Sequence, residues 1–220
     1  MSRAHVLLTV VAALFFASSS LAKAALPALA FQGGTPAEQA QVVKALNASS
    51  FNWSVIGVPV TVHIGDYEGD YATAGDVYFN ASLLDSGQFA WGTVQHEFGH
   101  QVDFALLTDA DRAQLQQALG VSTWFGDGTT TQLHSSLGAE RFASELAWAY
   151  WQSPSNAMSP SSIGIESNGM PVAQFRALVT QLLGVAPATT TPAAVPAGTV
   201  LAAPKVTTTP KTASKKTTRR

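Results

Sequence analysis

The 220-residue chain contains no cysteine. That absence excludes a disulfide framework, a thiolate metal ligand and a thiol nucleophile. Charged residues are also scarce, at 12%, whereas hydrophobic residues make up 46% of the chain. Such a composition can form a packed core, and it excludes wholesale disorder, a coiled coil and a collagen-like fibre. The length predicts one ordinary domain with appended segments.

The first 24 residues have the pattern of a secretory signal peptide. A basic start is followed by an apolar run of 12 residues, 6–17, and then by small residues up to Ala24. A bilayer span needs about 20 apolar residues, so this run is too short to be a transmembrane helix, and no later run is longer. We therefore expect residues 1–24 to be cleaved and the protein to be secreted. An uncleaved N-terminal anchor is the alternative.

Residues 186–220 contain neither acidic nor aromatic side chains. They consist mainly of Ala, Thr, Pro and Val, and they include six basic residues: Lys205, Lys211, Lys215, Lys216, Arg219 and Arg220. This composition cannot bury enough apolar surface to offset its chain entropy, which predicts a disordered tail. Its positive charge favours weak contact with anionic surfaces such as an envelope, nucleic acid or a membrane, although a solvated linker is an equal alternative.

The central part of the chain, residues 25–185, is acidic. It carries four basic residues against all 14 acidic ones, a formal net charge of −10. Polyanions are repelled by such a surface, so we expect no nucleic-acid binding by this part. The predicted organisation is therefore a signal peptide at 1–24, a folded domain at 25–185 and a tail at 186–220.

Strand signals come early in this domain. Residues 58–64 and 76–80 have the alternation and the β-branched or aromatic content typical of strands, and a polar loop is expected between them. A helix is predicted over residues 35–47, because its Thr-Pro-Ala-Glu start offers an N-cap and a capping box.

Helices are expected to dominate the rest of the domain. Ser86 is predicted to cap a long helix over residues 87–107, in which apolar residues recur at helical spacing. Further helices are predicted over residues 108–119, 137–151 and 171–184. A few strands followed mainly by helices, without internal repeats, predict an α+β domain.

The long helix contains the motif His96-Glu97-Phe98-Gly99-His100. Residues four apart lie one turn above each other, so both imidazoles can point at one ion while Glu97 projects beside it. This is the His-Glu-x-x-His arrangement of zinc hydrolases, in which the histidines bind Zn²⁺ and the glutamate activates a water held by the metal. Because the opposite helix face is apolar, we expect the histidines to face a cleft.

Two neighbouring residues are expected to support this motif. Gly99 would let another backbone pack close to the helix, with a tolerated glycine as the alternative. Asp103, one turn after His100, would accept the second ring N–H of that histidine and so select its tautomer. An ordinary polar helix position is the alternative for Asp103.

A catalytic zinc site also needs a third protein ligand and an open position for water. A further histidine six residues after His100 would be one solution, but Leu106 stands there, which excludes the metzincin pattern. The candidates downstream are His134, Glu140 and Glu145. The two glutamates are about 140° apart on an ideal helix, so they cannot both face the ion.

The stretch from His96 to Asp103, followed about 40 residues later by Glu140-Arg141-Phe142-Ala143, resembles the gluzincin metallopeptidases. Specifically, it looks like the catalytic domain of anthrax-toxin lethal factor and related small secreted gluzincins. The resemblance implies that Glu140 is the third zinc ligand. It also implies a zincin-like fold, in which a small mixed sheet packs on the metal-binding helix and residues 76–80 form the edge strand for substrate. That family often has an acid directly after Phe-Ala, where this chain has Ser144.

The mechanism implied by the resemblance is peptide hydrolysis with one bound Zn²⁺. His96, His100 and Glu140 would hold the ion, and Glu97 would be the general base toward a metal-activated water. His134 is the leading candidate for a second catalytic residue that stabilises the oxyanion, with an exposed loop histidine or an extra metal ligand as the alternatives. Weaker candidates for that role are Tyr67, Tyr71 and Tyr150.

The sequence thus predicts a secreted, monomeric zinc endopeptidase that acts on a protein or peptide substrate. Two alternatives stay open at this point. One is a cell-wall amide hydrolase whose basic tail holds it at an anionic envelope. The other is a non-catalytic binding module that retains the zincin fold, although the presence of Glu97 argues against it.

Overall fold

The computed structural model describes residues 25–127, 133–160 and 169–184. The signal peptide expected at residues 1–24 and the tail expected at residues 186–220 lie outside the described residues, so both stay predictions. The chain divides into two units, Met1–Thr190 and Thr191–Arg220, and all described residues belong to the first.

Four strands form one mixed sheet in the N-terminal half of this unit. They are β1 (Leu29–Gly33), β2 (Val60–Gly65), β3 (Tyr71–Thr73) and β4 (Asp76–Asn80). Their order across the sheet is β1-β2-β4-β3, with β1, β2 and β4 parallel and β3 antiparallel to β4. Side chains of β2 and β4 alternate between buried and partly exposed positions, so one face of the sheet packs on the core.

Helix α1 (Pro36–Ala48) connects β1 to β2 and begins with the predicted capping box. The Thr35 hydroxyl accepts the N–H of Glu38, and the Glu38 carboxylate accepts the N–H of Thr35. These two bonds satisfy backbone donors that the first helical turn leaves unpaired. The sequence therefore specifies this helix start locally.

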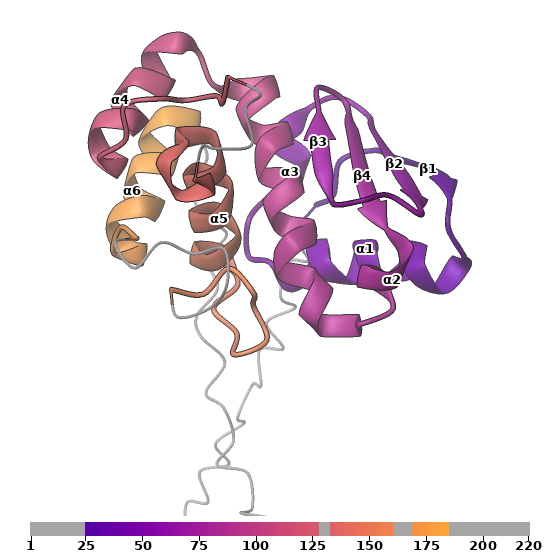
Figure 1. The fold of residues 1–220 in the computed structure, drawn as a ribbon. Helices are drawn as coiled ribbons and strands as arrows, with labels where there is room; N and C mark the ends of the chain where they lie inside the picture. The colour runs from indigo at the N-terminus through magenta and orange to yellow at the C-terminus, as the bar shows by residue number, and fades with distance from the viewer. Residues whose placement is uncertain (1–24, 128–132, 161–168, 185–220) are drawn as a thin grey trace, which may run out of the picture. The chain divides into compact units, whose positions relative to one another are not determined.

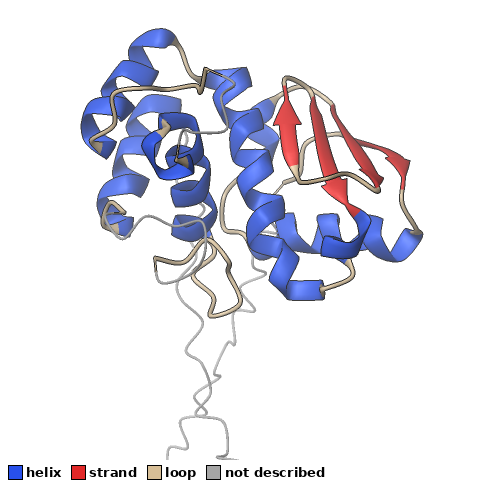
Figure 2. Ribbon diagram, viewed as in Figure 1, coloured by secondary structure: helices blue, strands red, loops and turns tan. Residues whose placement is uncertain are grey.

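Helices make up most of the described chain after β4 (Figure 2). The longer ones are α3 (Trp91–Leu106), α4 (Asp109–Leu119), α5 (Gly138–Tyr150) and α6 (Val172–Leu183). Shorter elements are α2 (Ala81–Leu84) and the 3₁₀ turns η1 (Trp53–Ile56), η2 (Gly87–Ala90) and η3 (His134–Ser136). Within the described ranges, no helix combines the length and the apolar character that a membrane span requires.

Helix α3 lies in the middle of this unit. The sheet, α1 and α2 are on one side of it, and α4, α5 and α6 are on the other (Figure 1). On the core side of α3, Val94, Phe98 and Val102 are fully buried. This central position leaves α3 in contact with both α5 and the strand β3, which together determine what surrounds its histidines.

The α+β class predicted from the sequence is confirmed, with a small mixed sheet followed by a helical C-terminal part. The predicted strands correspond to β2 and β4, and the helices predicted for α1, α4, α5 and α6 are confirmed. The sequence analysis did not predict β1, and it assigned the three residues of β3 to a loop.

Two details of the prediction are wrong. Residues 76–80 are not the edge strand, because β3 pairs with β4 on its outer side and is itself the last strand. The long helix also starts later than expected. Ser86 makes no capping bond, and its hydroxyl donates back to the carbonyl of Leu83, so a 3₁₀ turn precedes α3, which begins at Trp91.

Candidate metal centre

The motif residues of α3 are all buried. His96, Glu97 and His100 are at most 7% exposed, although all three line a cleft. The helix is anchored by the apolar residues on its other face, so their backbone positions are well determined by packing. The distinctive feature of this region is therefore the arrangement of the two imidazole rings and the carboxylate.

Helix α5 brings Glu140 to the same place. The two helices approach closely at Gly99, where a Cβ atom would lie 2.9 Å from Cα of Ala143 and 3.1 Å from its Cβ. Any side chain at position 99 would push α5 away. The expectation that Gly99 allows close backbone packing is confirmed, and the consequence is that Glu140, one turn before Ala143, faces the histidines.

Three ligand atoms form a nearly equilateral triangle. The Nε2 atoms of His96 and His100 are 3.2 Å apart, and Oε2 of Glu140 is 3.1 Å from the first and 3.2 Å from the second. In a tetrahedral site with metal–ligand distances of about 2.0 Å, neighbouring ligand atoms lie about 3.3 Å apart. The triangle therefore has the dimensions of one face of such a tetrahedron.

His134 from η3 joins these three residues, and the four together are called the histidine cluster below. Its Nε2 lies 2.7 Å from Oε2 of Glu140, and its ring stacks at 5.4 Å on that of His96. Its side chain is 50% exposed, unlike the two buried histidines. The structure thus brings His134 to the predicted site, in a position to donate to Glu140 or to serve as a further ligand.

Glu97 lies beside the triangle and not in it. One of its carboxylate oxygens is within 4.8 Å of a ring nitrogen of both His96 and His100. Burial, with the charges of Glu140 and Asp70 adding to it, raises the pKa of Glu97 to about 7. A carboxylate with such a pKa can both accept and release a proton near neutral pH.

Ser144 is placed to select the tautomer of His96 that can bind a metal. The Ser144 hydroxyl donates to Sδ of Met158, at 3.6 Å, and its oxygen is then free to accept the Nδ1–H of His96, at 3.1 Å. In that tautomer the lone pair is on Nε2, which faces the cluster, whereas the opposite tautomer donates its Nε2–H to Glu140. Burial also lowers the pKa of His96 to about 4, so the ring is neutral at pH 7 and can act as a ligand.

The Glu140 carboxylate is stabilised in its ionised form. Burial alone would raise its pKa, but the bonds from His100, His134 and His96 outweigh that effect and lower it. For His100 the partner also outweighs burial, but the pKa moves in the opposite direction. Burial opposes protonation of the ring, yet the hydrogen bond to Glu140 and its negative charge raise the pKa of His100. The Glu140 carboxylate and the two imidazoles thus converge on one point, where a cation could replace the protons that they share.

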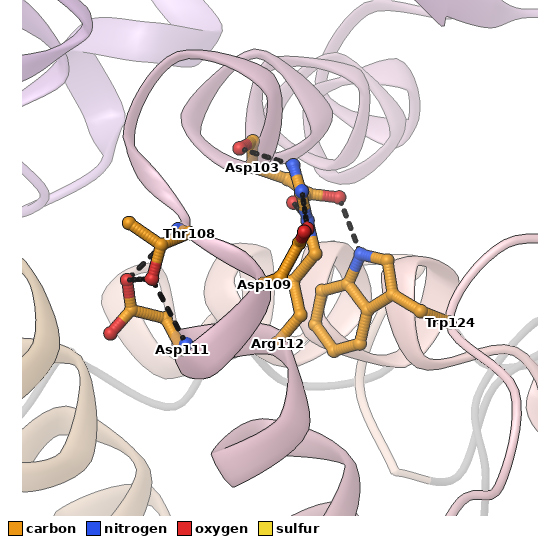
Figure 3. A network of polar contacts seen from close by, with 6 residues as sticks. All are labelled: Asp103, Thr108, Asp109, Asp111, Arg112 and Trp124. Atoms are coloured by element: carbon orange, nitrogen blue, oxygen red, sulfur yellow. Dashed lines mark hydrogen bonds and ion pairs between the residues drawn. The ribbon is translucent and has the colours of Figure 1, made fainter.

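The predicted role of Asp103 as the hydrogen-bond acceptor of His100 is wrong. Its carboxylate, fully buried, accepts Nε–H of Arg112 at 2.8 Å and the indole N–H of Trp124 at 2.9 Å, and not the ring N–H of His100. Figure 3 shows these bonds, with Asp109 as the second partner of Arg112. We call Asp103, Arg112 and Trp124 the Asp103 network. It ties α3 to α4 and to the segment before α5.

Glu145 points away from the histidine cluster, as the helix geometry predicts. Its carboxylate is buried, lies 3.5 Å from the guanidinium of Arg141 and accepts the N–H of Met170 at 3.1 Å. It therefore connects α5 to the segment that leads into α6. Of the two candidate glutamates, only Glu140 faces the histidines.

A cleft of about 320 Å³ opens in front of the cluster. Its lining includes Tyr71 and Ala72 of the edge strand β3, and Asp70 just before it. Strands β3 and β4 form a hairpin, and the side chain of Gln101 holds it on α3. The Nε2 of Gln101 donates to the Thr73 carbonyl at 2.8 Å, and its Oε1 accepts the Gly75 N–H at 2.9 Å. Because Gln101 follows His100 directly, the edge strand is fixed relative to the histidines.

The sequence analysis did not identify Asp70 or Gln101. A long-range side-chain contact between a helix and a three-residue strand leaves no periodic signal. Among the weaker tyrosine candidates, Tyr71 lines the cleft and Tyr67 packs edge-on against it at 6.4 Å. Tyr150 is buried against Phe51 in the core and does not line the cleft.

Comparisons of this chain with protein-family models, with curated proteins and with solved structures found no match. The interpretation of the site therefore rests on its own geometry and on the sequence pattern.

Proposed function

We propose that this protein is a secreted zinc-dependent peptide hydrolase with a zincin-like fold, in which His96, His100 and Glu140 hold one Zn²⁺. The observation that carries the proposal is the triangle of ligand atoms with sides of 3.1–3.2 Å, next to the buried carboxylate of Glu97. Two imidazoles and one carboxylate are the ligands of catalytic zinc in many hydrolases, and they leave a position open.

Bound zinc supplies Lewis acidity toward a carbonyl group and lowers the pKa of water. Glu97 then acts as the general base: it accepts a proton from the attacking water and passes it to the nitrogen of the leaving amine. Its carboxylate lies within 4.8 Å of a ring nitrogen of both His96 and His100, next to the proposed zinc position. His134, half-exposed at the rim of the cluster, donates its ring N–H to the oxygen that becomes negatively charged.

The edge strand β3 supports a peptide as the substrate. It is the last strand of the sheet, and two of its three residues line the cleft. An extended peptide can add to such an edge through main-chain hydrogen bonds, which are independent of its sequence. The proposal of a zincin-like fold is also based on this strand, because β3 is an antiparallel edge strand beside the helix that carries the His-Glu-x-x-His motif. Secretion is proposed from the sequence of residues 1–24 alone.

The test is Glu97→Gln, with Glu68→Gln as the control. Glu68 is an exposed residue of the loop before β3 and does not line the cleft. We expect one zinc per chain in wild type and both variants by elemental analysis. Hydrolysis of a peptide library, followed by mass spectrometry, should fall at least 1,000-fold in Glu97→Gln only, because the base is lost.

Two results would reject the proposal. One is a wild-type protein, loaded with zinc, that cleaves no peptide. The other is a Glu97→Gln variant that retains its activity. Cell-wall fragments assayed in parallel would show whether an amide other than a peptide backbone is the substrate.

A further inference from the structure

An aromatic wall borders one part of the cleft. Phe104, one turn after His100 on α3, and Phe125, from the segment after α4, both line the cleft together with the histidines. The rings of His100, Phe104 and Phe125 follow one another at 6.2 and 6.3 Å, in nearly parallel planes. Phe125 is 49% exposed, so it offers a large apolar surface to whatever enters the cleft.

The Asp103 network holds this wall in place. The guanidinium carbon of Arg112 lies over the Phe125 ring, 5.3 Å from its centroid, while the Nε–H of Arg112 is bonded to the buried carboxylate of Asp103. Asp103 also binds the indole of Trp124, the residue before Phe125. Two neighbouring residues thus connect the wall to α3. Trp124 bonds directly to Asp103, and Phe125 packs against Arg112, which is itself bonded to Asp103.

Backbone bonds connect the same segment to the start of α5. The Thr123 carbonyl accepts the N–H of Gly138 at 2.8 Å, and the Trp124 carbonyl accepts the N–H of Ala139 at 3.0 Å. Glu140 is the next residue. The aromatic wall and the carboxylate of the histidine cluster are therefore positioned by one set of contacts.

We infer that Phe104 and Phe125 form a subsite for a bulky apolar side chain of the peptide substrate, and that Arg112 is a positioning residue for this subsite. The inference rests on the proposed function. The occupant is a substrate side chain because the wall is continuous with the histidine cluster through His100. Covering two aromatic rings favours an apolar side chain over a small one, and such pockets discriminate roughly 10- to 200-fold.

The peptide library first identifies the position near the scissile bond at which the wild type prefers an apolar residue. The experiment then compares two peptides of equal length that differ only at this position, one with Phe and one with Ala. The readout is the ratio of their kcat/KM values, which does not depend on the fraction of folded enzyme. Phe125→Ala should lower the ratio about tenfold. Arg112→Lys keeps the charge but not the planar stack and should lower it about threefold. The control is Phe89→Ala, a residue that is 60% exposed on η2, outside the cleft.

A second readout does not require catalysis. Binding of the same two peptides to Glu97→Gln, measured by fluorescence anisotropy, should show the same preference, and Phe125→Ala should remove it in that background. If the wild type cleaves peptides but Phe125→Ala leaves both ratios unchanged, the subsite is wrong and the proposed function stands. If no peptide is cleaved but the binding preference depends on Phe125, the subsite stands and the hydrolase is wrong.

Discussion

Helix α3 carries two buried polar clusters one turn apart, and they differ in how they are completed. In the Asp103 network each carboxylate oxygen accepts an N–H from another side chain, Arg112 or Trp124. In the histidine cluster two ring nitrogens and a carboxylate oxygen converge at 3.1–3.2 Å. The first arrangement is a self-sufficient network of donors and acceptors, whereas the second gathers two imidazole nitrogens and a carboxylate oxygen at distances that a cation could bridge.

The comparison shows that burial alone does not distinguish structural from functional polar residues. Asp103 is more deeply buried than His100 or Glu140, yet its carboxylate bonds to Arg112 and Trp124 and does not face the cleft. The histidine cluster opens on a cleft, and its two buried histidines have pKa values displaced in opposite directions, lowered for His96 by burial and raised for His100 by Glu140. The two clusters should therefore respond differently to mutation: one in stability, the other in zinc binding.

The largest effect on stability is expected from Asp103→Ala. It leaves the Arg112 charge and the Trp124 N–H without their buried partner, so the free energy of unfolding should fall by about 3 kcal/mol in a denaturant titration. Asp109→Ala removes the other, fully exposed partner of the same arginine and should cost less than about 0.5 kcal/mol. Equal losses in the two variants would contradict the structural role of the network.

A smaller effect, on the metal, is expected from Ser144→Ala. Losing the acceptor for His96 Nδ1–H frees the ring to change tautomer, and zinc affinity should fall about 10- to 100-fold in a competition titration with a chelator. Ser49→Ala is the matched control, since Ser49 is a buried serine that accepts the Phe51 N–H away from the cluster. Similar zinc affinity in the two variants would show that Ser144 does not select the tautomer.

The smallest effect is expected at the start of α4. Thr108→Ala removes its capping box with Asp111 and should cost about 1 kcal/mol of unfolding free energy, with zinc affinity unchanged. Bonds from Thr108 lower the pKa of Asp111 below its ordinary value of 3.8. The cap therefore stabilises the fold above pH 3.8, and this contribution is lost as the pH falls through the lower, folded-state pKa. A cost that stays constant down to pH 2 would contradict this assignment.

Local signals explain why the sequence predicted most of the helices. Caps such as Thr35 and Thr108 act within one turn, and the four-residue spacing of His96 and His100 determines their common face. β1 was missed because it is short and mostly exposed along its length. β3 was missed because its three residues become a strand only by pairing with β4 and by the contact with Gln101.

The residues of the candidate site show the same difference between local patterns, which the sequence reveals, and long-range contacts, which it does not. His96, Glu97, His100 and Glu140 were identified from spacing and from a family resemblance, and the structure brings them together. Asp103 was misjudged because its partners, Arg112 and Trp124, come from later segments whose approach no local pattern encodes. Phe104 and Phe125 were not identified for the same reason: an aromatic pair across 21 positions looks like ordinary core residues in a sequence.

The central claim is that Glu140, and not Glu145, completes a zinc site with the two histidines of α3. The most direct measurement is the zinc affinity of Glu140→Gln and of Glu145→Gln, two variants that differ only in which face of α5 loses its charge. We expect one zinc per chain in the wild type, at least a 100-fold loss of affinity in Glu140→Gln and less than a threefold change in Glu145→Gln. Wild-type affinity in Glu140→Gln would contradict the account.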